Sequence, residues 1–175
     1  MTYKIVIFPS QHIQDEADAL RKRYDPEYPN IAPHITIKSN FSLTDVTEKD
    51  IIKSLNTIAK QTESFPIYLS KVSSFYPVTN TIYFKVEPTT ALTTLFEKTH
   101  HGIFPNQHQY SFVPHITIAQ NLLNDEYSDV FGSLQISEIS FDDVIDRFHL
   151  CYKQDDGTWS IKQTFIFNQN EKENT

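Results

Sequence analysis

The chain has 175 residues, of which 39% are hydrophobic and 13% aromatic, and its formal net charge is −7. This length fits one domain that buries a hydrophobic core, and the composition argues against a disordered chain. The negative charge argues against a broad surface for duplex nucleic acid, which needs clustered lysine and arginine, although a small anionic ligand still fits a locally basic cleft.

Other common classes of protein are not expected because their sequence motifs are missing. The three glycines do not form GxGxxG or GxxxxGK[ST], so Rossmann and Walker nucleotide sites are not expected. A single cysteine, Cys151, cannot form an internal disulfide. The start of the chain lacks the pattern of a signal peptide, and no stretch approaches the roughly eighteen apolar residues of a membrane span. We therefore expect a cytoplasmic protein that does not contact membranes.

The first part of the chain predicts alternating strands and helices. Strands are indicated by β-branched and aromatic residues, and helices by apolar positions at helical spacing. Thr47 followed by Asp50 is typical of a capped helix start. In chain order we expect a strand at 3–8, a helix at 11–24, a strand at 34–38, a helix from Thr47 to residue 59, and a strand at 65–73. The charged segment 15–27 is expected to be a solvated helix face.

The second part predicts a similar order with two more strands. We expect a strand at 81–87, a helix at 89–104, a strand at 115–119, a weakly patterned segment at 123–131, and strands at 133–141, 146–153 and 158–167. The acidic stretch 141–146 is expected to be a solvated turn. The organisation expected is one domain over 1–168 and a disordered polar tail over 169–175.

A five-residue repeat dominates the sequence. The segment PHITI occurs at 33–37 and again at 114–118, 81 positions later. The same offset aligns residues 3–5 with 84–86, so each half reads strand–helix–strand–helix–strand, as after an internal duplication. We therefore predict an α+β fold of two pseudo-symmetric lobes. Each lobe would hold an antiparallel sheet with flanking helices, and a central cleft would separate the two.

Strand alternation divides the residues of the repeat between two faces. The isoleucines of each copy point one way, towards a core, and the histidine and threonine point the other way. If the lobes face each other, His34, Thr36, His115 and Thr117 line one cleft. Imidazoles transfer protons near neutral pH, and hydroxyls bind the non-bridging oxygens of a phosphate.

A structural role for these residues is the alternative interpretation. A single strand histidine is more often a hydrogen-bonding group than a catalyst, and a recent duplication copies residues without function. However, most of the two halves has diverged while these five residues are identical. This contrast favours a functional pair of motifs.

Three stretches resemble the 2H phosphoesterase superfamily, which is defined by two H-x-[ST]-x motifs in a duplicated two-lobed fold. They are YKIVIFPSQHIQDEADALRKRY (3–24), YSFVPHITIAQ (110–120) and DRFHLCYKQDDGTWSIKQTF (146–165). The superfamily includes bacterial 2′-5′ RNA ligase-like (LigT) proteins and 2′,3′-cyclic nucleotide phosphodiesterases. The chain is most similar to its YjcG-like branch.

The resemblance implies roles for the repeated residues. His34 and His115 would be general acid and base in either order, and Thr36 and Thr117 would hold the phosphate. No cofactor or metal is implied, and the histidines at 100, 101 and 108 lack the carboxylate or cysteine partners of common metal sites. One departure is Gln120, where RNA ligase-like proteins usually carry an arginine.

Four further residues are candidates for substrate binding. Lys38 shares strand parity with His34 and Thr36. Lys4 and Lys85 align in the opening strands of the two halves, and Tyr83 has the right character to stack on a base. The alternatives are a solvated strand lysine and a tyrosine that packs at the edge of a lobe.

The function expected is a metal-independent phosphoesterase that hydrolyses a cyclic phosphodiester of a nucleotide or a short RNA end. Two alternatives stay open: a module that binds a nucleotide or phosphate without turnover, and an enzyme that joins RNA ends. The sequence does not predict the oligomeric state.

Overall fold

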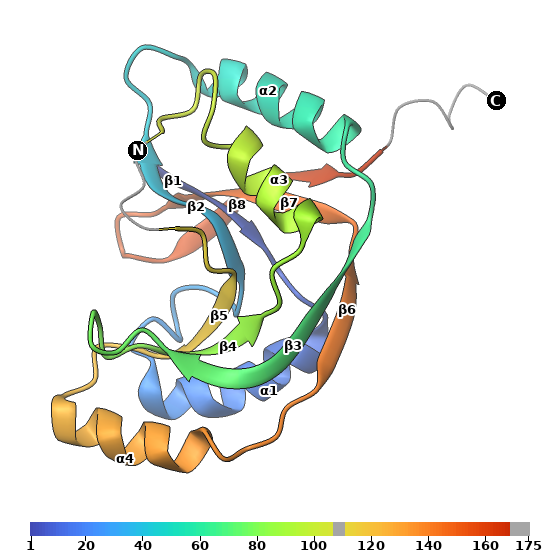
Figure 1. Ribbon diagram of the computed structural model, residues 1–175. Coiled ribbons are helices and arrows are strands. Elements are labelled where there is room, and N and C mark those ends of the chain that lie inside the picture. The colour runs from blue at the N-terminus through green and yellow to red at the C-terminus, as the bar shows by residue number, and fades with distance from the viewer. Residues whose placement is uncertain (107–110, 169–175) are drawn as a thin grey trace.

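The computed structural model describes residues 1–106 and 111–168, which form an α+β fold (Figure 1). Predicted and observed elements agree closely over the first half of the chain. In the described residues the elements are β1 (Thr2–Ile7), α1 (Gln11–Tyr24), β2 (Ile35–Ser42), α2 (Glu48–Lys60), β3 (Phe65–Ser74), β4 (Ile82–Val86), α3 (Thr90–Lys98), β5 (His115–Ala119), α4 (Asn124–Leu134), β6 (Phe141–Ile145), β7 (Arg147–Lys153) and β8 (Trp159–Ile166).

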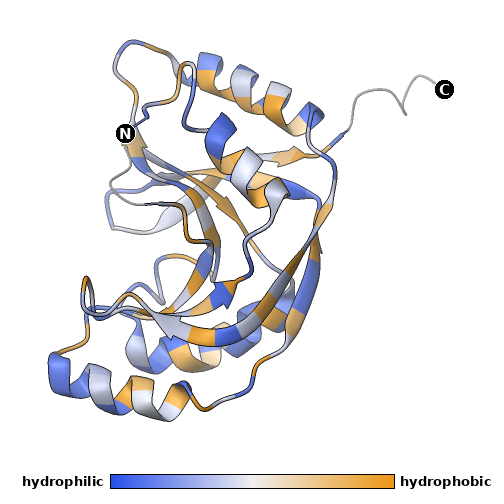
Figure 2. Ribbon diagram, viewed as in Figure 1, coloured by the Kyte–Doolittle hydropathy of each residue, from blue (hydrophilic) through white to orange (hydrophobic). Residues whose placement is uncertain are grey.

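Local sequence explains where the helices begin. The Thr47 hydroxyl accepts from the backbone N–H of Asp50, whose carboxylate accepts from the N–H of Thr47, so the predicted capping box of α2 is confirmed. Thr89 caps α3 in a similar way through the N–H of Leu92. Apolar and polar residues alternate around α2 and α4, as an amphipathic helix on a sheet requires (Figure 2).

The strands form one antiparallel sheet in the order β6-β3-β4-β5-β2-β1-β7-β8. It consists of two four-stranded halves, one on each side of the junction between β5 and β2. At that junction the two motif strands are joined by the pairing of Ile35 with Ile116. The predicted two-lobed α+β architecture is therefore confirmed, with the sheets of the two lobes continuous through this pair.

The lobes do not coincide with the two halves of the sequence. Strand β3, which ends the first half, pairs with β4 and β6, whereas β7 from the second half pairs with β1. The helices also exchange: α1 packs on β5 and α3 packs on β2. Each half of the chain thus contributes to both lobes, so neither lobe is complete without the other half.

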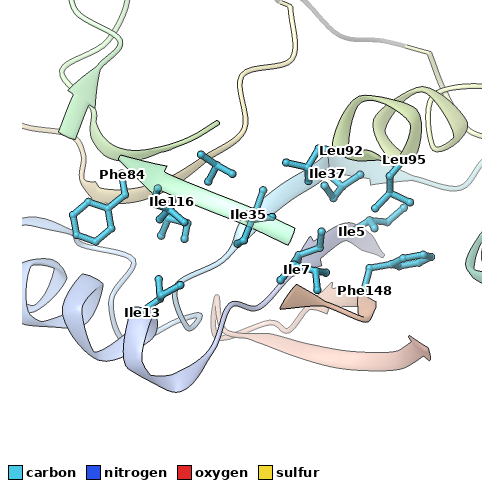
Figure 3. Packing of buried hydrophobic residues seen from close by; sticks show 14 of the residues in the cluster. Ile5, Ile7, Ile13, Ile35, Ile37, Phe84, Leu92, Leu95, Ile116 and Phe148 are labelled. Atoms are coloured by element: carbon cyan, nitrogen blue, oxygen red, sulfur yellow. The ribbon is translucent and has the colours of Figure 1, made fainter. Parts of the chain in front are cut away.

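The hydrophobic core follows the sheet across the junction (Figure 3). Ile35, Ile116 and Ile5 are fully buried. In Figure 3, Ile13 of α1 lies near Ile116, and Leu92 of α3 lies near Ile37 on the other side of the junction. The buried isoleucines of both motifs thus lie on the helix-covered face, as the alternation predicted.

The second half departs from the sequence prediction in three places. The weakly patterned segment 123–131 lies largely in helix α4, and the strand predicted at 133–141 is wrong because that helix continues to Leu134. The predicted turn at 141–146 is strand β6, which pairs with β3 at an edge of the sheet, where its acidic residues reach solvent. Helix α3 ends at Lys98 rather than at 104, and Gly102 then adopts a left-handed turn conformation at φ 66°.

The junction isoleucines should be essential to stability. We expect Ile116→Ala to lower the free energy of unfolding by about 2–5 kcal/mol, because it removes buried methyl groups and leaves a cavity between the lobes. Ile161→Ala, at a position that is 50% exposed on β8, should change it by less than about 0.5 kcal/mol. Urea unfolding followed by circular dichroism measures both, and equal losses would contradict a shared core at the junction.

Candidate active site

The junction of β2 and β5 brings the two motifs together. Continuing the antiparallel register of Ile35 and Ile116 by one residue on each side places His34 opposite Thr117 and Thr36 opposite His115. All four side chains lie on the sheet face away from the buried isoleucines, and all four are half-buried. The structure therefore brings together the four residues that the repeat predicted.

Both histidines are held in the same way. Nδ1 of His34 lies 2.8 Å from the carbonyl oxygen of Ala32, and Nδ1 of His115 lies 2.7 Å from that of Val113. A carbonyl oxygen only accepts, so each Nδ1 carries the proton and donates it. In the neutral imidazole, Nε2 is then an unprotonated acceptor that is available to a ligand.

Both imidazoles favour the neutral form. Burial lowers the pKa of His34, and the positive charge of Lys4 lowers it further, against a smaller opposing effect of the bond to Ala32. Burial also lowers the pKa of His115, again opposed by its backbone bond. The two rings are close enough for a charge on His115 to disfavour protonation of His34. In the free protein at neutral pH, both rings are therefore bases.

Aromatic rings fix the position of each imidazole. The ring of Phe75 meets His115 edge-on at 4.9 Å between centroids, and Tyr83 contacts the same ring at 5.0 Å. On the other motif, Phe8 packs edge-on against His34 at 6.3 Å. Tyr83 is 5% exposed, so in this structure it supports His115 and does not present an open ring to a base.

A cavity of about 330 Å³ opens beside the motifs. His34, Thr36 and Thr117 line it, whereas His115, opposite Thr36 on β5, is not one of its lining residues. The cavity extends along the lobe formed by β2, β1, β7 and β8, where residues of β1, β2 and the β7–β8 hairpin line it. Those that carry polar or aromatic groups are Lys4, Asn40, Lys153 and Trp159.

The three candidate lysines have different environments. Lys4 lines the cavity. Lys85 pairs with His115 across β4 and β5, so it shares the face of the motifs. Val6 of β1 lies opposite Thr36, and Tyr83 of β4 lies opposite Thr117. The first strands of the two halves, β1 and β4, therefore correspond at an offset of 77 residues (83 minus 6) rather than 81. Lys4 and Lys85 are thus not structural equivalents.

The placement of Lys38 beside His34 and Thr36 is wrong. A β-bulge between the pairs Val6–Thr36 and Ile5–Lys38 reverses the alternation of β2, so Lys38 points to the helix-covered face with Ile5. Its Nζ donates to the carbonyl oxygen of Pro105 at 2.5 Å, and the residue is 3% exposed. Burial lowers the pKa of Lys38 to about 8.

A buried polar cluster beside the cavity was missed from sequence. Asp25 accepts from Nε of Arg21, from Nε2 of Gln120 at 2.8 Å and from the N–H of Glu27. Arg21 also donates to Asp18 and to the carbonyl oxygen of Ile31. The cluster joins the end of α1 and the loop before His34 to the end of β5. Segment 15–27 is thus not only a solvated face, and the i, i+4 spacing of Arg21 and Asp25 was the signal available.

His149 and Cys151, which also lie on this face, are both buried. His149 is buried, its Nδ1 lies 2.9 Å from the Thr164 hydroxyl, and its ring packs on Phe8. Burial raises the pKa of the Cys151 thiol to about 11, so it stays protonated at neutral pH.

The described residues contain no group of metal-ligating side chains and no helix that could span a membrane. Among residues 1–106 and 111–168, no three histidine, cysteine or acidic side chains are grouped as metal ligands. His108, part of the histidine cluster considered from sequence, lies outside the described residues. Within the same part of the chain, each helix is too short or too polar to cross a bilayer.

Comparison with known proteins identifies the family. The sequence model of the 2′-5′ RNA ligase superfamily matches residues 9–157 of this chain, which include both motifs. The chain belongs to this superfamily. The resemblance to the 2H phosphoesterases is thereby confirmed, while assignment to the YjcG-like branch stays a prediction.

Related sequences cover almost the full chain. "Putative phosphoesterase OB1230" of Oceanobacillus iheyensis is 51% identical over 166 residues, covering 95% of this chain and 98% of that protein. "Putative phosphoesterase GWCH70_0799" of Geobacillus sp. (strain WCH70) is 46% identical over 173 residues, covering 99% of this chain and 100% of that protein. These relatives are named as phosphoesterases, in agreement with the superfamily.

Solved structures share the fold at low sequence identity. TT0787 of Thermus thermophilus matches with a TM-score of 0.68 at 15% identity, covering 96% of this chain and 98% of that one. E. coli LigT, in a complex with 3′-AMP, matches with a TM-score of 0.62 at 15% identity, covering 95% and 98%. At this identity the likeness establishes the two-lobed fold alone.

The histidine environments predict a measurable pH response. By NMR titration, His34 and His115 should both titrate below pH 6.5, the ordinary histidine value, and both should return towards it in denaturant. The folded state then binds fewer protons than the unfolded chain as pH falls below 6.5, so the free energy of unfolding should decrease with falling pH. Midpoints above 6.5 in the folded protein would contradict the neutral pair.

Proposed function

We propose that this protein hydrolyses a cyclic phosphodiester of a nucleotide or short RNA end, with His34 and His115 as general base and general acid. The observation that carries the proposal is the cross-strand square of two histidines and two threonines, in which each histidine is held by a carbonyl through Nδ1. Two imidazoles that present Nε2 on one face supply both proton transfers of a phosphoester hydrolysis, so the reaction should proceed without added metal.

The mechanism assigns one task to each side chain. Nε2 of one histidine takes a proton from water as the water oxygen forms a bond to phosphorus. The bond from phosphorus to the leaving oxygen breaks, and the second histidine gives its Nε2 proton to that oxygen. Thr36 and Thr117 donate hydrogen bonds to the non-bridging oxygens, which stabilises the charge that develops on them. One water is consumed, and a phosphomonoester and a free hydroxyl are formed.

The charges around the histidines support one assignment of roles. Burial lowers the pKa of both histidines, and Lys4 further disfavours the protonated form of His34. His34 is therefore better suited as base and His115 as acid. Because both are neutral in the free protein, the acid must be protonated when an anionic phosphate binds and raises its pKa.

A small substrate is favoured by the site. The cavity of about 330 Å³ is at the lower end of the range for small-molecule sites. E. coli LigT, which shares the fold, has been crystallised with 3′-AMP, and with phosphate in another structure. A nucleotide-sized phosphoester is the simplest ligand that matches both observations.

Removal of either histidine should abolish turnover. On a panel of 2′,3′-cyclic nucleotides in EDTA, we expect His34→Ala and His115→Ala each to lower kcat by about 10²–10⁴-fold. His101→Ala, which changes an exposed histidine in the turn after α3, serves as the matched control and should retain full activity. Activity that disappears in EDTA, or that survives both substitutions, would contradict the two-histidine mechanism.

The pH dependence separates catalysis from binding alone. The value of kcat/KM should be bell-shaped, with its optimum below pH 6.5, because both free-enzyme pKa values lie below that of an ordinary histidine. Above the optimum, log(kcat/KM) should fall with a slope near −1 as the acid loses its proton. Stopped assays of nucleotide product over a pH series measure this. A protein that binds 3′-AMP but turns over no member of the panel would instead be a non-catalytic binding module.

A further inference from the structure

A second group of residues lines the same cavity at a distance from the motifs. Lys4 of β1 and Lys153 of β7 both border it, together with Trp159 at the start of β8. Lys4 pairs with Cys151, and Lys153 pairs with Trp159, so the three side chains share the sheet face of the motifs. The backbone N–H of Trp159 donates to the carbonyl oxygen of Asn30 at 2.9 Å, which ties the hairpin to the loop before His34.

The positive charges of these lysines are not neutralised by ion pairs. Nζ of Lys4 lies 4.5 Å from the centre of the Trp159 ring, a cation–π contact that positions the ammonium and leaves its charge intact. Among the ion pairs of the described residues, none includes Lys4 or Lys153.

The other charges of the cavity do not cancel this excess. Arg21 and Asp25, which also border it, are paired with each other. Glu27 is the other acidic residue of the lining. It attracts the Lys4 ammonium only at longer range, and its carboxylate accepts a hydrogen bond from Asn30. A local excess of positive charge in a chain of net charge −7 therefore coincides with the part of the cavity that Lys4 and Lys153 line.

The distance from the motifs suits one nucleotide. Val6 lies opposite Thr36, and Lys4 is two residues along the same strand and on the same face. Two residues of a strand span about 7 Å, so the ammonium can reach an anion that lies one sugar away from the phosphate held by Thr36. The effect of Lys4 on the pKa of His34 shows that the two groups share one electrostatic environment.

We propose that Lys4 and Lys153, with Trp159 holding Lys4 in place, form a second anion subsite, so that the substrate carries another phosphate one sugar away from the ester that is cleaved. This inference rests on the proposed function for the role of the first phosphate. It narrows the substrate class to nucleotides or RNA ends with a 5′-phosphate beside the reacting 2′,3′-phosphate. Two threonines and two histidines bind the first phosphate, and two lysines bind the second.

Binding of two product analogues tests the subsite. Isothermal titration would compare adenosine 3′-monophosphate with adenosine 3′,5′-bisphosphate at about 0.1 M ionic strength, where surface charges are screened. We expect the wild-type protein to bind the bisphosphate about tenfold more tightly, as one additional charge-assisted contact provides. Lys4→Met and Lys153→Met should each remove most of this preference. The ratio of the two affinities is the readout because Lys4 also affects His34, and hence the monophosphate.

Lys162→Met is the matched control. Lys162 lies on the same hairpin but pairs with Glu48 of α2, away from the cavity, and its replacement should leave the ratio unchanged. Equal affinity of the wild type for the two ligands, or a preference that survives both lysine substitutions, would overturn the proposal.

Turnover of 2′,3′-cyclic AMP with and without a 5′-phosphate separates this proposal from the proposed function. A bisphosphate preference without turnover of either nucleotide would retain the subsite and reject the hydrolysis. Turnover of both at the same kcat/KM, with no preference in binding, would retain the hydrolysis and reject the subsite.

Discussion

The pairing of Ile35 with Ile116 is the contact on which the site depends. It is the hydrogen-bonded junction between two four-stranded halves of the sheet, and it lies between two copies of the same pentapeptide. Because the strands are antiparallel, a pair at the isoleucine places each histidine opposite the threonine of the other copy. A one-residue slip would turn the motifs into the core and the isoleucines into the cleft. Burial of the isoleucines therefore sets the register of the polar residues.

The exchange of elements between the halves protects this junction. Helix α1 packs on β5, α3 packs on β2, and β3 and β7 join the sheet halves opposite to their own motif strands. Separating the lobes would expose apolar surface from both halves of the chain at once, at a cost that scales with the area exposed. The short pairing between β2 and β5 is thus sufficient to join the two lobes, because the helices hold the halves in place.

The two histidines of the site have equivalent contacts but different charged neighbours. Each imidazole donates through Nδ1 to the carbonyl two residues earlier and packs against an aromatic ring. Lys4, however, acts on His34, and the Arg21–Asp25–Gln120 cluster joins the end of α1 to the end of β5. Two motifs that are identical in sequence thereby differ in their electrostatic surroundings, and the proposed division of roles between base and acid rests on this difference.

The sequence alone determined the features that depend on local spacing. Alternation in PHITI assigned His34, Thr36, His115 and Thr117 to one face, the Thr47–Asp50 pair marked the start of α2, and the repeat predicted two lobes. These features succeed because strand alternation and helix capping depend on residues within a few positions of one another.

Tertiary structure alone decided what depends on pairing between distant segments. A bulge in β2 places Lys38 on the other face of the sheet, and the strand register aligns β1 with β4 at an offset of 77 residues. Segment 141–145 forms strand β6 because it pairs with β3 at the edge of the sheet. Arg21 and Asp25 became buried because the loop before His34 and the end of β5 close over them. Pairing partners, bulges and burial are properties of the assembled sheet, and the free energy that selects them comes from contacts between residues far apart in the chain.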